Sequence, residues 1–199
     1  MKPILYSTEM VKAILDGRKT QTRRVVKPDI VSGFDVDVDG SIVAYIDQAT
    51  GDSFKPGDIA PYLPGDILYV RETWQDMSDN KGEYVYLADG DKGLFDKDWG
   101  VVTTKEIKWR PSIHMPREAV RLFLLVRNVR VERVQDITEE DVLAEGCGLA
   151  SWTQDDWPKT AGFAQLWDSL NAKRGYGWKN NDWVWVIEFE RTEATTDEI

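Results

Sequence analysis

Short strand-like segments separated by turn signals make up most of this sequence, and they restrict the folds that the chain can adopt. Two Pro-Gly-Asp turns, at 56–58 and 64–66, come shortly before a strand-like run at 67–74. The longest strand signal follows at 121–134, and a run rich in valine and tryptophan at 183–189 ends the series. Many strands with few helices predict an α+β fold, in which a small, partly open β-barrel is decorated by three or so helices.

Local signals predict where these helices lie. Ser7 or Thr8 can cap the first, Gly17 stands where it would end, and its apolar side chains share one face: Met10, Val11, Ile14 and Leu15. Thr138 can cap a second helix, which has an acidic first turn. A third helix is predicted over 161–171 from its apolar periodicity.

No linker, low-complexity tract or internal repeat divides the chain. We therefore expect one domain over 1–190, with an insertion at about 75–110 and a polar, acidic tail over 191–199. Within the domain, residues 28–56 are typical of a hairpin with its turn at 39–40. The 199 residues, of which 42% are hydrophobic and 30% charged, are enough to bury a core.

The composition excludes several kinds of site and location. No apolar run approaches the roughly 20 residues that a membrane-spanning helix needs, and the first residues do not resemble a signal peptide. We therefore expect a cytoplasmic protein without a membrane partner. A single cysteine, Cys147, excludes an intramolecular disulfide and a multi-cysteine zinc site. With only one histidine, His114, the sequence predicts neither a metal site nor a cofactor.

A basic stretch from Gly17 to Arg24 follows the first helix, and it holds four cationic side chains and two hydroxyls. With Lys27 it supplies five of the 25 basic residues, and the remaining 20 stand against 35 acidic residues in a chain of formal net charge −10. A local positive field in an acidic protein predicts a pocket for one anionic or polar ligand. The alternative is a solvated turn whose arginines pair with nearby carboxylates.

The order of residues in this stretch resembles a known family. Gly17-x-Lys19, with Arg24 five residues later and a short helix before it, resembles the signature of the ASCH domain, which belongs to the PUA-like superfamily of RNA-associated barrels. The segments at 68–74 and 113–117 are similar to those of ASCH proteins carried by bacteriophages and prophages. Further pieces in the same order are found at 64–66, 137–140 and 145–146. The resemblance covers about 2–190 and implies a PUA-like barrel.

One branch of that family consists of small acetylcytidine amidohydrolases with a catalytic lysine, threonine and glutamate. The matching residues here are Lys19, Thr22 and Glu145, the last of which lies eight residues after Ile137. The chain departs from that branch in having the insertion and a proline-rich loop around His114. The resemblance therefore implies an amidohydrolase of this type as one candidate activity.

Hydrolysis of an acylated amine needs a nucleophile, a base and a proton donor for the leaving amine. Thr22 would be the nucleophile, activated by a neighbour that takes its proton. Lys19 would be that base if burial and the neighbouring arginines lower its pKa, and Glu145 would protonate the amine. Alternatively, Lys19 and Arg24 bind phosphate, Thr22 is an ordinary strand hydroxyl, and Glu145 is an exposed residue near a helix end.

Six further side chains are expected to line the ligand site: Arg18, Arg23, Arg24, Arg71, Trp74 and His114. Trp74 follows a strand, so it could stand at the barrel mouth and stack on a base, with core packing as its alternative. His114 lies in the proline-rich loop, where a structural role in that loop is the alternative.

These observations leave three functions open. The first is an RNA-associated ASCH protein that binds single-stranded RNA, a nucleotide or a modified nucleoside in a cationic pocket at the barrel mouth. The second is an enzyme, either an amidohydrolase of acylated cytidine or a ribonuclease on single-stranded RNA, that uses Lys19, Thr22 and Glu145. The third is a phage protein whose acidic exterior binds a host protein.

Overall fold

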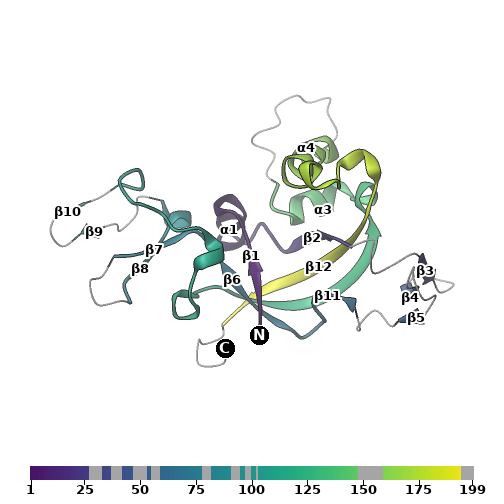
Figure 1. The fold of residues 1–199 in the computed structure, drawn as a ribbon, viewed down its shortest axis with the longest axis horizontal. Coiled ribbons are helices and arrows are strands. Elements are labelled where there is room, and N and C mark those ends of the chain that lie inside the picture. Colours follow the sequence, from purple (N-terminus) through teal and green to yellow (C-terminus); the bar gives the residue numbers. More distant parts are fainter. Residues whose placement is uncertain are drawn as a thin grey trace. The chain divides into compact units, whose positions relative to one another are not determined.

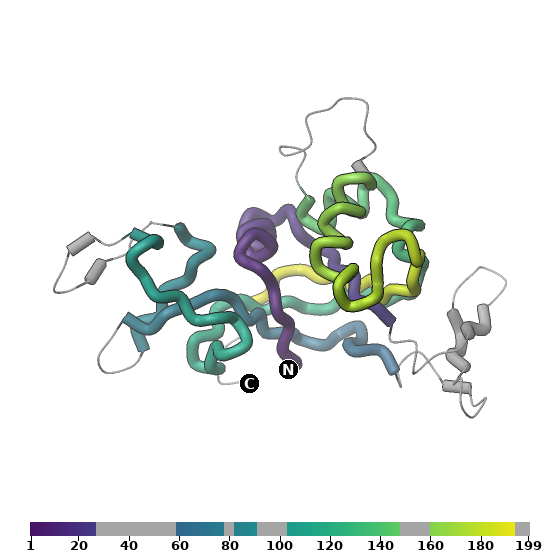
Figure 2. The backbone as a smooth tube through the Cα atoms, turned by 45° about the horizontal axis from the view of Figure 1, so that its top comes forward, coloured from purple at the N-terminus to yellow at the C-terminus, as the bar shows by residue number. Residues whose placement is uncertain are grey.

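The computed structural model describes residues 1–26, 33–36, 42–46, 53–54, 59–77, 82–90, 95–96, 100–101, 103–147 and 159–193. The chain forms two compact units, and neither is a continuous segment. Figures 1 and 2 show the helices and strands, coloured by residue number. Unit 1 consists of Met1–Gly17, Asp66–Leu125 and Glu190–Ile199, and unit 2 consists of Arg18–Gly65 and Val126–Phe189. The basic stretch after Gly17 therefore begins unit 2.

The described part of unit 1 combines the helix α1 with short strands. Its elements are β1 (Lys2–Leu5), α1 (Thr8–Leu15), β6 (Ile67–Arg71), β7 (Trp74–Asp76), β8 (Tyr84–Tyr86), β9 (Phe95–Asp96), β10 (Gly100–Val101), the 3₁₀ turns η1 (Leu87–Asp89), η2 (Ser112–His114) and η3 (Arg117–Ala119), and the start of β11 (Phe123–Arg133). β1 pairs with β6 in parallel, and β6 pairs with β11 in antiparallel fashion. The pairs β7–β8 and β9–β10 are antiparallel.

Unit 2 holds the other helices. Its elements are β2 (Gln21–Val25), β3 (Gly33–Val36), β4 (Ile42–Ile46), β5 (Ser53–Phe54), the rest of β11, η4 (Val134–Asp136), α3 (Glu139–Ala144), α4 (Lys159–Asn171), η6 (Ala172–Arg174), η7 (Trp178–Asn180) and most of β12 (Trp183–Thr192). β2 pairs with β12 in antiparallel fashion, with Thr22 opposite Ile187. In Figure 2 the yellow-green coil of α4 continues into the yellow segment that returns to β12.

Hydrogen bonds connect five strands in the order β1-β6-β11-β12-β2, and this mixed sheet together with the helices confirms the α+β class. Among the described residues this order has two ends, β1 and β2, so the sheet is not closed into a barrel. The predicted hairpin around 39–40 is present as the antiparallel pair β3–β4, although its turn lies outside the described residues. β12 extends to Thr192 and so includes the first residues of the predicted tail.

The cap signals in the sequence correctly predicted where α1 and α3 begin. The Ser7 side chain accepts a hydrogen bond from the backbone N–H of Met10, as an N-cap does. Gly17 adopts a φ of 73°, which costs a residue without a Cβ little, and it ends the turn after α1. Thr138 and Asp141 form a reciprocal capping box at the start of α3.

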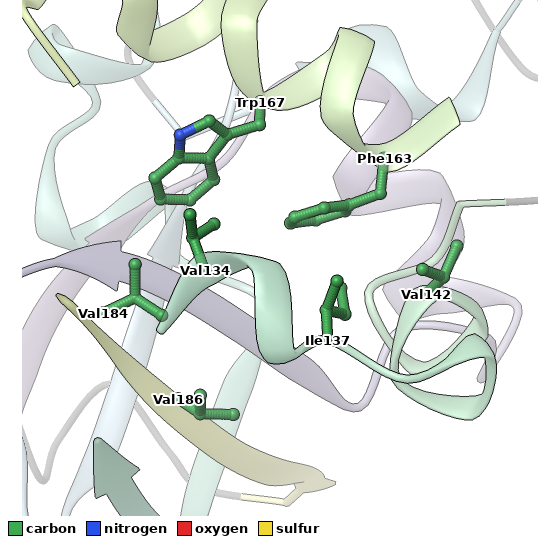
Figure 3. Packing of buried hydrophobic residues seen from close by; sticks show 7 residues of the cluster. All are labelled: Val134, Ile137, Val142, Phe163, Trp167, Val184 and Val186. Atoms are coloured by element: carbon green, nitrogen blue, oxygen red, sulfur yellow. The ribbon is translucent and has the colours of Figure 1, made fainter. Parts of the chain in front are cut away.

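The apolar core of unit 2 lies between α4 and the strands. Phe163 and Trp167 project from α4 toward valines of η4 and β12 (Figure 3). The buried members of this cluster are Val134, Ile137, Val142, Phe163, Trp167, Val184 and Val186. Burial of side chains of this size stabilises the unit by about 1.5–3 kcal/mol each, and it fixes α3 and α4 relative to β12.

Candidate functional site

The basic stretch meets the end of α3 within unit 2, and two of the predicted catalytic residues lie at this contact. Lys19 and Glu145 form an isolated antiparallel bridge between their backbones. Thr20 extends this contact, since its N–H donates to Ala144 O at 2.8 Å and its carbonyl accepts from the N–H of Phe189 at 2.8 Å. The backbone therefore places the Lys19 side chain against the end of α3.

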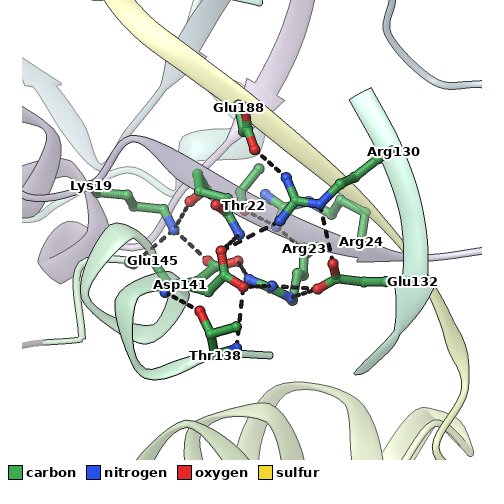
Figure 4. A network of polar contacts seen from close by, with 11 residues as sticks. Lys19, Thr22, Arg23, Arg24, Arg130, Glu132, Thr138, Asp141, Glu145 and Glu188 are labelled. Carbon is green, nitrogen blue, oxygen red and sulfur yellow. Dashed lines mark hydrogen bonds and ion pairs between the residues drawn. The ribbon is translucent and has the colours of Figure 1, made fainter. Parts of the chain in front are cut away.

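The Lys19 ammonium is buried and has a full set of acceptors. Its side chain is 0% exposed, and Nζ donates to Gln21 O at 2.8 Å, Glu145 O at 2.8 Å and Glu145 Oε2 at 2.7 Å (Figure 4). An ammonium carries three hydrogens, so these contacts use all of them. The two residues predicted to act together are thus brought together from positions 126 residues apart in the sequence.

Burial lowers the pKa of Lys19 below its ordinary value of 10.5. The charge of Glu145 and its hydrogen bond oppose this shift, whereas the Arg24 guanidinium adds to it. Arg24 is therefore one neighbouring arginine that lowers the pKa of Lys19, as the sequence predicted. Glu145 itself is buried, with 6% of its surface exposed, which excludes the alternative of a solvated residue at the helix end.

Arg23 holds the other oxygen of Glu145. Its Nη1 donates to Glu145 Oε1 at 3.2 Å, while Nη2 lies 3.1 Å from Asp141 Oδ2 and its Nε and Nη2 both donate to Glu132 Oε1. The guanidinium also lies over the Phe163 ring, 5.8 Å from its centroid. Arg23 therefore connects three carboxylates to the apolar core.

Arg130 extends the network on its outer side. It pairs with Glu132 at 3.2 Å, with Asp141 at 3.4 Å and with Glu188 (Figure 4). Three cations, Lys19, Arg23 and Arg130, are thus in contact with four carboxylates. Carboxylates therefore compensate the positive charge of Lys19 and Arg23. For Arg23 this is the pairing with nearby carboxylates that the sequence left open as an alternative.

Thr22 and Arg24 alternate along β2 with Gln21 and Arg23. The buried Thr22 Oγ1 accepts a hydrogen bond from Arg24 Nη1 at 2.8 Å, whereas Gln21 Nε2 donates to Asp141 Oδ1 at 3.0 Å. In a strand, successive side chains point to opposite faces. The catalytic role of Thr22 stays a prediction, because its hydroxyl is bonded to Arg24 and not to the ammonium of Lys19.

The remaining predicted ligand residues lie in different surroundings. Arg18 is exposed and donates from Nη1 to Gly146 O at 3.2 Å. Arg71, Trp74 and His114 belong to unit 1. Arg71 Nη2 donates to the carbonyls of Met115, at 3.1 Å, and Ile113.

Trp74 is a core residue of unit 1, with 4% of its surface exposed. Its ring meets Tyr84 edge to face, and the Arg110 guanidinium lies over it at 5.2 Å. His114 is exposed at the end of η2. Trp74 therefore packs in the core, which was the alternative to a place at the barrel mouth.

Sequence analysis missed the partners of Arg23. The sequence indicated only that Asp141 belongs to the acidic first turn of a helix. It indicated only that Glu132 is a polar residue in a strand. It also missed an ion pair in unit 1, where the buried Glu72 is bound by Arg121 at 2.9 and 3.0 Å. Burial raises the pKa of Glu72, although Arg121 opposes the shift.

The lone thiol lies beside the site. Burial raises the pKa of Cys147 to about 11, and the charge of Glu145 acts in the same direction. A thiol with this pKa stays protonated at neutral pH and is a poor nucleophile. Among the described residues no group of histidine, cysteine, aspartate and glutamate side chains is arranged to hold a metal ion.

In comparisons with known proteins, the chain matches no family model, no curated protein and no solved structure. In the part of the chain that the structure describes, no helix has the length and apolar character to span a membrane.

Proposed function

We propose that unit 2 is an amidohydrolase that removes an acyl group from the exocyclic amine of a modified nucleoside such as acetylcytidine. The observation that carries this proposal is the buried pair of Lys19 and Glu145, with Nζ 2.7 Å from Oε2 and the pKa of the lysine lowered. Strongly perturbed groups cluster at functional sites. The resemblance to ASCH proteins supplies the substrate class.

The pair has the chemistry that the two roles require. Transfer of one proton from Lys19 Nζ to Glu145 Oε2 along their hydrogen bond produces an amine and a carboxylic acid. A buried site favours this uncharged form more than water does. The amine can then act as a base and the acid as a proton donor.

Each bond change in the transfer of the acyl group to Thr22 then has a named group. Once bound substrate displaces Arg24 from Thr22 Oγ1, this oxygen would attack the acyl carbon, and its proton would pass to the amine of Lys19. The bond between carbon and nitrogen breaks as Glu145 protonates the leaving exocyclic nitrogen. Water hydrolyses the resulting ester on Thr22, releases a carboxylic acid and restores the hydroxyl.

An absorbance assay on acetylcytidine tests this proposal. We expect turnover by the wild type and its loss in Lys19→Ala, Glu145→Gln and Thr22→Val. The matched control is Lys12→Ala, which removes an exposed lysine that pairs with Glu9 on α1. A wild type without turnover, or turnover that is equal in Lys19→Ala and Lys12→Ala, would exclude the amidohydrolase.

A second candidate is binding of a nucleotide or short single-stranded RNA without chemistry. The exposed side chain of Arg18 and the half-buried Arg24 favour it, because they are the cations of the basic stretch nearest to solvent. Titration of fluorescent RNA oligonucleotides would report both binding and any cleavage. Affinities that are unchanged when Arg18, Lys19 and Arg24 lose their charge would exclude this site.

We also propose that the fold is a PUA-like, partly open β-barrel decorated by helices. The unclosed mixed sheet, with α1, α3 and α4 among the described elements, supports this finer class. An experimental structure that encloses no barrel would contradict it.

A further inference from the structure

Arg23 is the least exposed cation of the basic stretch after Lys19. Its side chain is 1% exposed, yet it contacts carboxylates on both β11 and α3. The aromatic face of Phe163 lies against the same guanidinium. A planar fork with several fixed partners has little freedom to rotate, so Arg23 is a rigid part of the site.

The two oxygens of Glu145 have different partners as a result. Oε1 accepts from Arg23 Nη1, and Oε2 accepts from Lys19 Nζ. A carboxylate held at both oxygens has a defined orientation. Without Arg23, Glu145 would lose the contact at Oε1, and its carboxylate could turn away from the geometry that now faces Lys19.

We propose that Arg23 is a positioning residue, which holds Glu145 so that Oε2 meets Lys19 and keeps the proton of this pair on the lysine in the resting state. The catalytic consequence rests on the amidohydrolase proposed above, whereas the position of the proton can be measured without any substrate.

The charge of Arg23 decides where the proton lies because it acts unequally on the two forms of the pair. The guanidinium attracts a Glu145 carboxylate that it touches, and it repels the Lys19 ammonium from farther away. Its net effect therefore favours ammonium and carboxylate over amine and acid. Burial acts in the opposite direction. Arg23 thus opposes premature neutralisation of the pair, together with the two backbone carbonyls that accept from the Lys19 ammonium.

Other charged groups surround the pair on each element, and a test must separate their effect from that of Arg23. They are Arg24 of β2, Arg130 and Glu132 of β11, Asp141 of α3, Glu188 of β12 and the thiol of Cys147 after α3. Arg130 offers a matched control, because it binds the Glu132 and Asp141 that anchor Arg23 but has its third contact at Glu188.

NMR of the intact chain, labelled with ¹⁵N and ¹³C in its lysine and glutamate side chains, tests the proposal. In the wild type we expect an ammonium signal for Lys19 Nζ near neutral pH. In Arg23→Gln this signal should move toward that of an amine, and the Glu145 carboxyl signal should move toward its protonated value. Arg130→Gln should leave both signals as in the wild type.

Signals that stay unchanged in Arg23→Gln, or that move equally in Arg130→Gln, would overturn the proposal. Circular dichroism establishes that each variant is folded. If Arg23→Gln does not fold, Arg23→Met takes its place, since it removes the same charge and puts an unbranched apolar side chain in the buried position. The same shifts are then expected, and signals equal to those of the wild type would overturn the proposal.

Kinetics separate this inference from the proposed function. On acetylcytidine we expect kcat/KM of Arg23→Gln to fall on the order of tenfold to a hundredfold, as misplaced catalytic groups do, with partial rescue in Arg23→Lys. A changed pH profile should accompany the fall in Arg23→Gln and be absent in Arg130→Gln. A shifted Lys19 signal in a protein without turnover would refute the amidohydrolase while supporting the position of the proton.

Discussion

Glu145 Oε2 lies 2.7 Å from Lys19 Nζ, and the two side chains are 5% and 0% exposed. Each ion has lost most of its hydration, so each depends on the other for compensation. The carboxylate has a further partner in Arg23, whereas the other two acceptors of the ammonium are backbone carbonyls. Variants that remove one member of the pair therefore measure the loss of stability caused by a buried charge without its ionic partner.

Removal of both members of the pair should destabilise the protein less than the two single removals added together. We expect Lys19→Met or Glu145→Leu alone to lower the free energy of unfolding by about 3–5 kcal/mol, because each leaves a buried charge without its partner. The double variant should lose less than the sum of the two. Urea denaturation of all four proteins measures this coupling, and additive losses would contradict it.

Asp141 should make stability depend on acid pH. Burial alone would raise its pKa, but hydrogen bonds from Gln21 and Thr138 and the charges of Arg23 and Arg130 hold it below its ordinary value of 3.8. A carboxyl with a lower pKa in the folded state contributes stability above 3.8, and this contribution is lost as the pH falls through the folded value.

Asp141→Asn should therefore be less stable than the wild type at neutral pH, and its stability should fall less steeply on acidification below about pH 4. Unfolding in urea from pH 7 to pH 3 measures both effects. Glu9→Gln is the control, since Glu9 is 81% exposed and pairs only across the surface of α1 with Lys12. Equal slopes for the two variants would show that Asp141 does not carry this dependence.

The elements around the site were largely predictable because their signals are local. Ser7 and Thr138 cap their helices through neighbours three residues away, and Gly17 alone supplies the positive φ after α1. The pairing of Lys19 with Glu145 was predicted only through the resemblance to a family. No local rule connects residues that far apart.

The charge network could not be predicted in the same way. Glu139, Glu140 and Asp141 look alike in sequence, yet Asp141 is the one that meets Arg23. That choice depends on how α3 packs against β2, which composition does not encode. Net charge also gives no information on which residues pair. The basic stretch therefore predicted a positive field at Arg23, whereas in the structure three carboxylates surround its guanidinium.

Cys147 should react slowly with alkylating reagents in the folded protein. Its pKa is raised to about 11 from 9.0, so the folded state holds roughly a hundredfold less thiolate near pH 8 than the unfolded state. We expect alkylation by iodoacetamide, followed by mass spectrometry, to be slower by about that factor than in urea, and to accelerate as the pH approaches 11. The sequence has one cysteine, so no other thiol contributes. Equal rates in the folded and unfolded protein would contradict the shift.

Gly17→Ala should destabilise the protein through the backbone alone. No heavy atom lies within 4 Å of an added Cβ, but the φ of 73° is one that alanine adopts at a cost of about 1–2 kcal/mol. Gly177 is the matched control, since its φ is −67° and an added Cβ would make only ordinary contacts, the nearest at 3.5 Å.

Alanine should therefore lower the free energy of unfolding at position 17 and raise it at position 177. Gly177→Ala should raise the free energy of unfolding by about 0.4–1 kcal/mol, because it restricts the unfolded chain. Thermal denaturation of both variants measures the difference. A loss well above 2 kcal/mol in Gly17→Ala would contradict an effect confined to the backbone of this turn. A loss near zero would mean that the turn can relax without glycine.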